Sequence, residues 1–465
     1  MLCMLVADGI ALAQKAPPVP QHPWDSTLAQ QQLKAPPRLL PTPNIDPAKI
    51  YTLSELVDIG EQNNPDTRVA WQNAKARAAD LGIAKSTLYP TMAAAVLAET
   101  SRAGIFFGPD FMRQTVETYS PIFVVDYAIF DLQRSQDISI SRNNLLAANF
   151  QFNDTHRRVI FQVMDAYYRL LDDKGQQEAA EANLMNARTV RQAAEARLDN
   201  GLATLPDVLE ARSAEAQADY DLQAAIGATE IAHGDLATAL GISPTVQIQV
   251  ESIHDVKLPD HIDDSVETSI DKALAQRPDL MQRIADLRAA GAEVSAARRA
   301  YAPKLSLDGH AGEARSYGEQ INLPGVYSPT LQIWDAQLSL TWTIFDGLAR
   351  ENRLAKAHAD QKQAAAAVDA VRDRVENEVW SAYSTARTAL RQQKAAAALL
   401  EAASESYNAA LESYNYGLRT QIDVVSAQRT LADARTADIT ARTNLLTGLA
   451  ALSYQTGDLL YAKIP

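Results

Sequence analysis

The chain has 465 residues, of which 47% are apolar and 22% charged, and this composition excludes a largely disordered protein and a polytopic helical membrane protein. Its formal net charge of -14 and its scattered cationic residues exclude a nucleic-acid surface, which needs clustered Lys and Arg side chains. Cys3 is the only cysteine, so a disulfide framework and a multi-cysteine metal site are excluded as well.

The N-terminal residues 1–13 carry part of the pattern of a signal peptide. Ala11-Leu12-Ala13 has the small residues that precede a secretory cleavage site. However, Asp8 interrupts a short apolar stretch, and no Lys or Arg precedes Lys15. We therefore predict a weak signal peptide over residues 1–13, with a mis-assigned start codon as the alternative interpretation.

Residues 14–50 are rich in proline, which fixes φ and removes a backbone hydrogen-bond donor. We therefore expect an extended, largely polyproline segment rather than a domain. A disordered tether is the competing interpretation.

The rest of the chain consists of two similar halves, residues 51–245 and 266–460, joined by a linker over residues 246–265. Three motifs occur once in each half, in the same order and 213 to 216 residues apart. They are Asn64-Pro65-Asp66 with Arg277-Pro278-Asp279, Ile129-Phe130-Asp131 with Ile344-Phe345-Asp346, and Gly201-Leu202-Ala203-Thr204 with Gly417-Leu418-Arg419-Thr420. So small a drift in spacing indicates a tandem repeat.

Each half is predicted to contain the same elements in the same order: a helix that ends before a proline, two strands, a very long helix and a returning helix. In the first half they cover residues 66–88, 91–100, 115–130, 131–200 and 204–240. In the second half they cover residues 279–301, 304–312, 334–345, 346–416 and 420–455, followed by a C-terminal segment over residues 456–465.

The strands are recognised by their alternation. Leu338, Leu340 and Trp342 alternate with the polar Ser339 and Thr341, a period of two that is typical of a strand with one apolar face. The corresponding strand of the first half has four apolar residues in the same phase: Phe123, Val125, Tyr127 and Ile129.

Each predicted strand has about 10 residues, the length of a tilted β-strand that crosses a bilayer. Four such strands cannot close a barrel, and open edges in hydrocarbon leave backbone groups unsatisfied at a cost of several kcal/mol each. Two chains would supply eight strands around a filled interior, whereas three would supply twelve around a passage. The strands therefore favour a homotrimer, with a soluble four-stranded sheet with one wet face as the alternative.

The long helices have a narrow apolar stripe. No Gly or Pro interrupts residues 348–416, which at 1.5 Å per residue form a helix of about 100 Å. Val368, Val371, Val375 and Val379 are spaced by threes and fours. A stripe this narrow suits helices that pack on each other as coiled coils rather than around a globular core.

Together, the ordered and duplicated motifs over residues 51–460 resemble the TolC-type outer membrane factor family of efflux proteins. The resemblance implies a mainly α fold with β, in which a long α-helical barrel of coiled-coil hairpins joins a transmembrane β-barrel shared between the protomers of a trimer. It also implies a mixed equatorial belt, to which residues 246–265, a helix over residues 53–63 and the C-terminal segment would belong. By the same resemblance, the shorter helices of each half stack end to end.

The implied function is a passive exit duct of a tripartite efflux or type I secretion system in the outer membrane of a Gram-negative bacterium. Its implied partners are two sister copies, a periplasmic adaptor protein, an inner-membrane pump reached through the adaptor, and outer-membrane lipid. The main alternative is a periplasmic coiled-coil scaffold or adaptor protein without a pore. The transported substrate cannot be read from the sequence.

The two helical reversals are the candidate gate. The resemblance points to Asp207, Asp423, Arg419 and Tyr414 as the network that closes the periplasmic entrance, with Arg419 and Tyr414 reaching Asp207 on the neighbouring hairpin. Three copies of Asp423 around one axis would favour cations. From the residues alone, Thr204 with Asp207 and Thr420 with Asp423 also fit helix N-terminal capping boxes, so capping alone stays an open interpretation.

One position departs from the family pattern, because Ser426 stands where a second acid is common. Glu210, one turn after Asp207 on the same helix face, is our candidate replacement for that charge. By resemblance, the reversals would also dock the adaptor, through Gly201, Leu202, Thr204, Gly417, Leu418 and Thr420. Both glycines also fit plain helix C-caps that need a positive φ.

The sequence contains no enzyme signature: no phosphate-binding loop, no HExxH motif and no Gly-x-Ser-x-Gly. We therefore expect neither a catalytic residue nor a cofactor, and the energy for transport must come from a partner. His254 and His261 lie among Asp residues in a possible metal loop, but a solvated acidic linker explains them as well. We predict no metal site.

Overall fold

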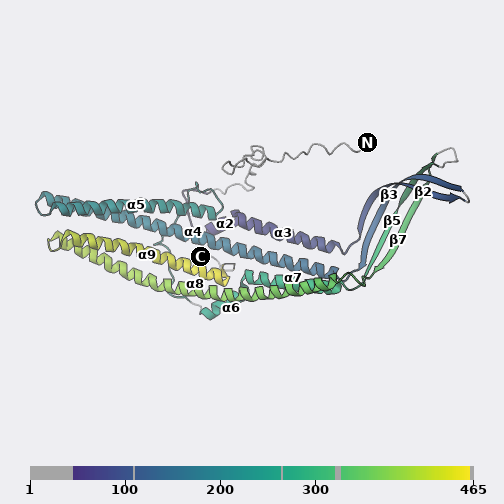
Figure 1. Cartoon of the computed structure of the whole chain (residues 1–465). Helices are drawn as coiled ribbons and strands as arrows, with labels where there is room; N and C mark the ends of the chain where they lie inside the picture. Colours follow the sequence, from purple (N-terminus) through teal and green to yellow (C-terminus); the bar gives the residue numbers. More distant parts are fainter. Residues whose placement is uncertain (1–44, 108–109, 263–264, 320–325, 461–465) are drawn as a thin grey trace, which may run out of the picture. The chain divides into compact units, whose positions relative to one another are not determined.

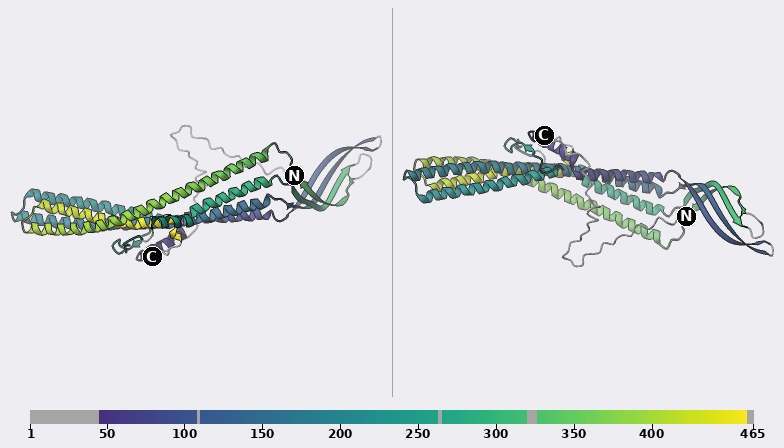
Figure 2. Two further views of the ribbon diagram at one scale, coloured as in Figure 1. Left: turned by 90° about the horizontal axis from the view of Figure 1, so that it is seen from below. Right: turned by 90° about the horizontal axis from the view of Figure 1, so that it is seen from above.

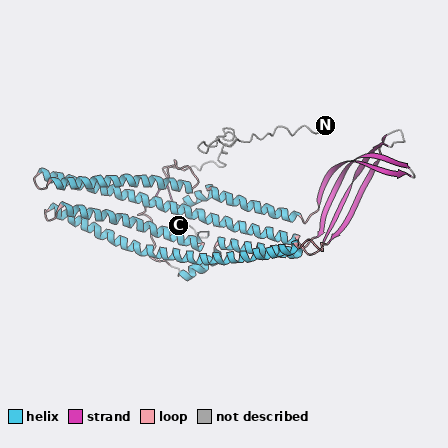
Figure 3. Cartoon of the chain, in the orientation of Figure 1, coloured by secondary structure: helices cyan, strands magenta, loops and turns pink. Residues whose placement is uncertain are grey.

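A computed structural model describes residues 45–107, 110–262, 265–319 and 326–460. The predicted signal peptide, most of the proline-rich segment and residues 461–465 lie outside these ranges. The described residues form long helices and one larger antiparallel sheet (Figure 3). Among them, no helix combines the length and the apolar character needed to cross a membrane.

The long helices of the two halves match closely in length. The first half contains α3 (Pro65–Ser86, 22 residues), α4 (Arg134–Asp199, 66 residues) and α5 (Leu205–Ala239, 35 residues). The second half contains α7 (Pro278–Arg299, 22 residues), α8 (Ala349–Asn415, 67 residues) and α9 (Gln421–Thr456, 36 residues). Both halves therefore follow the same element order.

The helices lie side by side, with α4 in contact with α3, α5, α7 and α9, and α8 in contact with α7 and α9 (Figures 1 and 2). The shorter helices meet end to end. At the end of α5, the Asn64 side chain donates to the Ala239 carbonyl at 3.0 Å. At the end of α9, the Arg277 guanidinium donates to the Gln455 side chain at 2.9 Å. Asn64 and Arg277 are the N-caps of α3 and α7, so each junction joins one helix end to the next helix start.

Short elements surround these junctions. They are α2 (Leu53–Asn63), α6 (Val266–Gln276), the 3-10 helix η1 (Asp458–Leu460), and the parallel strands β1 (Ile50–Tyr51) and β4 (Gln249–Val250). Around α2 and the middle of α4, buried aliphatic and aromatic side chains form the largest apolar cluster, which includes Leu56, Val163, Tyr167 and Leu171.

The valine stripe of α8 is buried as its spacing predicted. Val375 and Val379 are fully buried, and they cluster with Val368 of α8, Ala273 of α6 and Leu280 of α7. Small residues let the helices approach closely elsewhere along α8. At Gly448 of α9, an added Cβ would lie 3.3 Å from the Ala386 Cα. The apolar stripe therefore packs against helices of the same chain rather than around one globular core.

The larger sheet has the strand order β2-β3-β5-β7, with the short β6 (Val326–Tyr327) also paired to β5. Its strands are β2 (Thr91–Phe107), β3 (Asp110–Phe130), β5 (Lys304–Glu319) and β7 (Thr330–Thr341). All pairs are antiparallel, and the strands continue from the ends of α3, α4, α7 and α8 (Figures 1 and 2). Within this chain, β2 and β7 each have one unpaired edge among the described residues.

The strands differ from their predicted bounds. β2 extends to Phe107, β3 begins as early as Asp110, and β5 extends to Glu319. Backbone pairing continues in these segments although the side-chain alternation fades. By contrast, β7 ends at Thr341 rather than residue 345, since its partner Lys304 is the first residue of β5.

The long helices also begin later than predicted, α4 at Arg134 rather than residue 131 and α8 at Ala349 rather than residue 346. Leu348 has a φ of 66° and Gly347 a φ of 69°, so these two left-handed residues exclude a helix start at residue 346.

Candidate functional site

In the half of the sheet nearest the helices, the register separates a mainly apolar face from a mainly polar face. Residues that stand directly opposite each other on neighbouring strands share a face. The apolar face contains Met92, Val96, Phe123, Val125, Tyr127, Leu305, Leu307, Trp334, Leu338 and Leu340. The opposite face contains Glu99, Thr118, Asp126, Ser306, Asp308, His310, Asp335 and Gln337. Large side chains of the apolar face, such as Phe123, Trp334 and Leu338, are exposed in the single chain.

The face assignment of one residue differs from the sequence prediction. A register shift between Ala128 and Phe130 pairs Phe130 with Leu305. Phe130 therefore joins Tyr127 on the apolar face, and Ile129 is the extra residue of the bulge. A bulge inserts an extra residue, and because side chains alternate, every later residue changes face.

The two reversals at the far ends of the helices have the same backbone geometry. Gly201 has a φ of 72° and Gly417 a φ of 74°, and an added Cβ would meet nothing within 4 Å at either position. Glycine is therefore required by the backbone conformation rather than by crowding. The Leu202 and Leu418 side chains that follow are 69% and 79% exposed.

Both capping boxes form at these reversals. The Asp207 carboxylate accepts from the Thr204 amide at 2.8 Å and from the Thr204 hydroxyl at 2.7 Å. The Asp423 carboxylate accepts from the Thr420 amide at 2.9 Å and from the Thr420 hydroxyl at 2.8 Å. These hydrogen bonds lower the pKa of both carboxyl groups, so both remain charged at neutral pH.

The other gate candidates are Arg419, Tyr414 and Glu210, whose contacts with a neighbouring copy stay a prediction. Arg419 is exposed and, in the described part of the chain, makes no ion pair within 4 Å of Asp207 or Asp423; its charge only helps to lower the pKa of Asp423. Tyr414 is 5% exposed, and burial raises its pKa, as does the negative charge of Asp207. Glu210 lines a groove of about 780 Å³ between α5 and α9, which Gln428 and Arg429 also line.

A residue that the sequence did not indicate lies beside Tyr414. The Arg197 guanidinium donates to the Tyr414 carbonyl at 2.9 Å and lies 4.4 Å from the centre of the Tyr414 ring. Arg197 is in the last turn of α4 and Tyr414 in the last turn of α8, so this contact joins the two hairpins of one chain. Neither residue lies in a motif that marks the pairing.

The α7–α9 junction contains a buried ionic network, which the sequence also did not indicate. Arg157 and Arg277 are 1% and 3% exposed. One oxygen of Asp279 lies 3.3 Å from Arg157 and the other lies 2.7 Å from Arg277. Arg157 also pairs with Asp154 at 2.8 Å, and Arg277 with Glu378 at 2.8 Å. The only sequence signal was the Arg277-Pro278-Asp279 motif itself.

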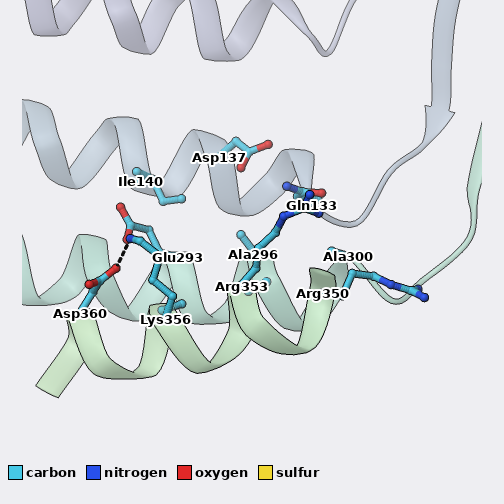
Figure 4. Close-up of a pocket in the computed structure, with 12 residues that line it drawn as sticks. Gln133, Asp137, Ile140, Glu293, Ala296, Ala300, Arg350, Arg353, Lys356 and Asp360 are labelled. Carbon is cyan, nitrogen blue, oxygen red and sulfur yellow. Dashed lines mark hydrogen bonds and ion pairs between the residues drawn. The ribbon is translucent and has the colours of Figure 1, made fainter. Parts of the chain in front are cut away.

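A third polar site lies where α4, α7 and α8 approach the sheet (Figure 4). A pocket of about 350 Å³ there is lined by Asp137, Glu293, Arg353, Lys356 and Asp360, among others. Lys356 pairs with Asp360 at 2.6 Å, and burial raises the pKa of Asp137. In the parts of the chain that the structure describes, no group of three or more His, Cys, Asp or Glu side chains could hold a metal ion.

Comparison with known proteins gives consistent likenesses. The model of a family described as "Outer membrane efflux protein" matches residues 56–242 and 269–458. The chain is 26% identical over 361 residues to Protein CyaE of Bordetella pertussis, covering 76% of this chain and 73% of that protein. It matches a solved membrane protein from Pseudomonas aeruginosa with a TM-score of 0.77 and 22% identity, covering 91% and 98% of the two chains. It matches the outer-membrane channel OprN with a TM-score of 0.75 and 22% identity, covering 89% and 93%.

Proposed function

Since this chain belongs to the outer membrane efflux protein family, we propose that three copies form one exit duct that closes at its helical reversals. The chain is an outer-membrane efflux channel protein, and its family and fold are those of channels rather than enzymes. The trimer, the closed tip and the partners are the parts that we propose here.

The observation that carries the trimer is an exposed apolar sheet face with an unpaired strand at each edge. In hydrocarbon, an unpaired edge costs several kcal/mol for each unsatisfied backbone group. Pairing β2 of one copy with β7 of the next satisfies both edges. Three copies then supply twelve strands, with the apolar face toward lipid and the polar face toward a water-filled passage. In this arrangement, the two halves of each chain are structural repeats, and each half supplies two long strands.

The reversals are our proposed docking site for a periplasmic adaptor protein, through which an inner-membrane pump would supply the energy. Leu202 and Leu418 are exposed at the tip with no apolar neighbour to cover them in the single chain, which suits a protein interface. Gly201 and Gly417 hold these leucines outward, and Thr204 and Thr420 cap the next helices. A drug efflux system and a type I secretion system would both use such a tip.

The proposed gate consists of Asp207, Glu210, Tyr414, Arg419 and Asp423. Capping occupies one oxygen of each Asp, which leaves the other oxygen for a neighbouring copy. Arg419 is exposed and could form a charge-assisted contact with Asp207 of the next hairpin. Three Asp423 carboxylates around the axis would attract cations.

The test of this function is conductance and ion selectivity in planar lipid bilayers. We expect Asp423→Asn to lower the cation-to-anion permeability ratio, because it removes a charge at the axis while keeping an oxygen that can cap. We expect Glu210→Gln to lower the ratio less, since Glu210 lies in the α5–α9 groove. Asp369→Asn, an exposed substitution in the middle of α8, is the control.

Three results would count against parts of the proposal or against all of it. Unchanged selectivity in the Asp423→Asn variant would show that Asp423 does not form a cation-attracting ring at the axis. Unchanged selectivity in Glu210→Gln would show that Glu210 does not replace the missing charge. A wild-type protein that is extracted without detergent and leaves bilayers silent would instead support a periplasmic scaffold.

A further inference from the structure

The two hairpin ends of one chain meet at a polar contact between Arg197 of α4 and Tyr414 of α8. The guanidinium donates to the Tyr414 carbonyl at 2.9 Å and lies 4.4 Å from the ring centre. Tyr414 is 5% exposed, and Arg197 is half-buried. A cation over an aromatic ring is stabilised, and more strongly where burial removes water from it.

The acceptor carbonyl belongs to the C-terminal cap of α8. The same Tyr414 oxygen also accepts from the Gly417 amide at 2.9 Å, and the Leu418 amide bonds the Ser413 carbonyl at 2.9 Å. The end of a helix carries a partial negative charge, which a cation stabilises. Arg197 therefore places a positive charge from one hairpin on the helix end of the other.

The contact is not fully satisfied, which suits a contact that must be released. The Nε atom of Arg197 is buried and has no hydrogen-bond partner. An unsatisfied buried donor is unfavourable, so the net stability of the contact is lower than its geometry suggests. A moderate external force could then separate the hairpins.

The contact has no counterpart in the duplicated half. At the spacing of 216 residues between Gly201 and Gly417, Ser413 corresponds to Arg197 and Leu198 corresponds to Tyr414. Neither can reproduce a cation over an aromatic ring. In a ring of alternating hairpins, the contact therefore joins the two hairpins within a protomer but not hairpins of adjacent protomers.

We propose that Arg197 is a positioning residue that latches the two hairpins of each protomer together at the tip and keeps the duct closed. This inference rests on the proposed function. It assigns the closing contact to the Tyr414 ring and carbonyl rather than to its hydroxyl. The latch also holds the Tyr414 ring near Asp207, whose charge acts on the tyrosine.

The experiment is single-channel conductance of the full chain in planar bilayers, with four variants. Arg197→Met removes the charge and the donors at similar length, so we expect a severalfold rise in conductance. Arg197→Lys keeps a cation at the helix end but loses the planar guanidinium, so we expect a smaller rise. Tyr414→Phe keeps the ring and the carbonyl and removes only the hydroxyl, so we expect a smaller rise in conductance than from Arg197→Met.

Arg188→Met is the matched control. Arg188 also lies on α4, but it pairs with Glu215 of α5 within one hairpin, at 3.4 Å. We expect this variant to conduct like the wild type. Thermal unfolding of each variant identifies any that fails to fold, and Arg197→Lys then carries the test.

The outcomes separate the latch from the wider proposal. If Arg197→Met conducts like the wild type while Tyr414→Phe opens the channel, the hydroxyl closes the tip and the latch is wrong. If Arg188→Met opens the channel as much as Arg197→Met, the effect is a general loosening and the latch is again wrong. If the wild type and all variants form no channel, the proposed function itself fails.

Discussion

Replacing Asp279 by Ala should destabilise the protein by about 3 kcal/mol, near the lower end of the range for breaking a buried ion pair. The Asp279 carboxylate is the only acidic group within 4 Å of both Arg157 and Arg277 among the described residues. Without it, the two buried guanidinium groups keep Asp154 and Glu378 as their acidic partners. The loss should be measured as a lower midpoint of thermal or denaturant unfolding of the assembled protein in detergent.

Asp66→Ala provides the matched control, because Asp66 occupies the same place after the proline of the first half. Asp66 is exposed and interacts mainly with the start of α3, so its loss should cost no more than about 1 kcal/mol. Equal destabilisation by the two substitutions would show that the buried network contributes little.

The same network predicts a loss of stability in acid. Burial alone would raise the pKa of Asp279, but hydrogen bonds and charge from Arg277, together with the charge of Arg157, hold it below the ordinary value of 3.8. A carboxyl with a lowered folded-state pKa contributes its full stability above pH 3.8, and this contribution is lost as the pH falls through the lower value. Unfolding midpoints measured between neutral pH and pH 2 should therefore fall more steeply in the wild type than in Asp279→Ala.

Replacing Leu338 by Arg should prevent stable insertion, because a charge on the lipid-facing side of a membrane strand costs about 2–4 kcal/mol at the bilayer centre. Leu338 lies on the apolar face, directly opposite Leu307. The preceding residue, Gln337, lies on the polar face opposite Asp308. Gln337→Arg should therefore be tolerated, since the new charge faces water and an acid.

The measurement is the yield of folded, detergent-extracted protein after refolding into lipid vesicles. We expect Leu338→Arg to reduce this yield strongly and Gln337→Arg to leave it near the wild-type value. If both variants fold equally well without lipid, the apolar face is not in contact with hydrocarbon. The soluble sheet with one wet face would then be the correct interpretation.

Several features could be predicted because they depend on neighbouring residues in the sequence. The valine stripe of α8 predicted its buried side, since a helix brings every third and fourth residue together. The Gly-Leu-x-Thr motifs predicted both reversals, since a positive φ and a capping hydroxyl act within one turn. The motifs also carried a resemblance to the correct family.

Other features of the sheet depended on the partner strand. Backbone pairing extended β2, β3 and β5 beyond their predicted bounds, and β7 ended early because its partner strand β5 begins at Lys304. The bulge near Ala128 moved Phe130 onto the apolar face. Strand ends and bulges are set by the partner strand, which a single alternation pattern does not contain.

The amino-acid sequence by itself determined the order of the elements, the duplication and the apolar sides of helices and strands, because these follow from local propensity and periodicity. Only the tertiary structure decided that Arg197 meets Tyr414, 217 residues away, and that Asp279 lies between Arg157 and Arg277. Long helices of nearly uniform composition can pack in many registers, and local sequence does not distinguish them. Which charges meet is decided by the register in which the helices pack and bury those charges away from water.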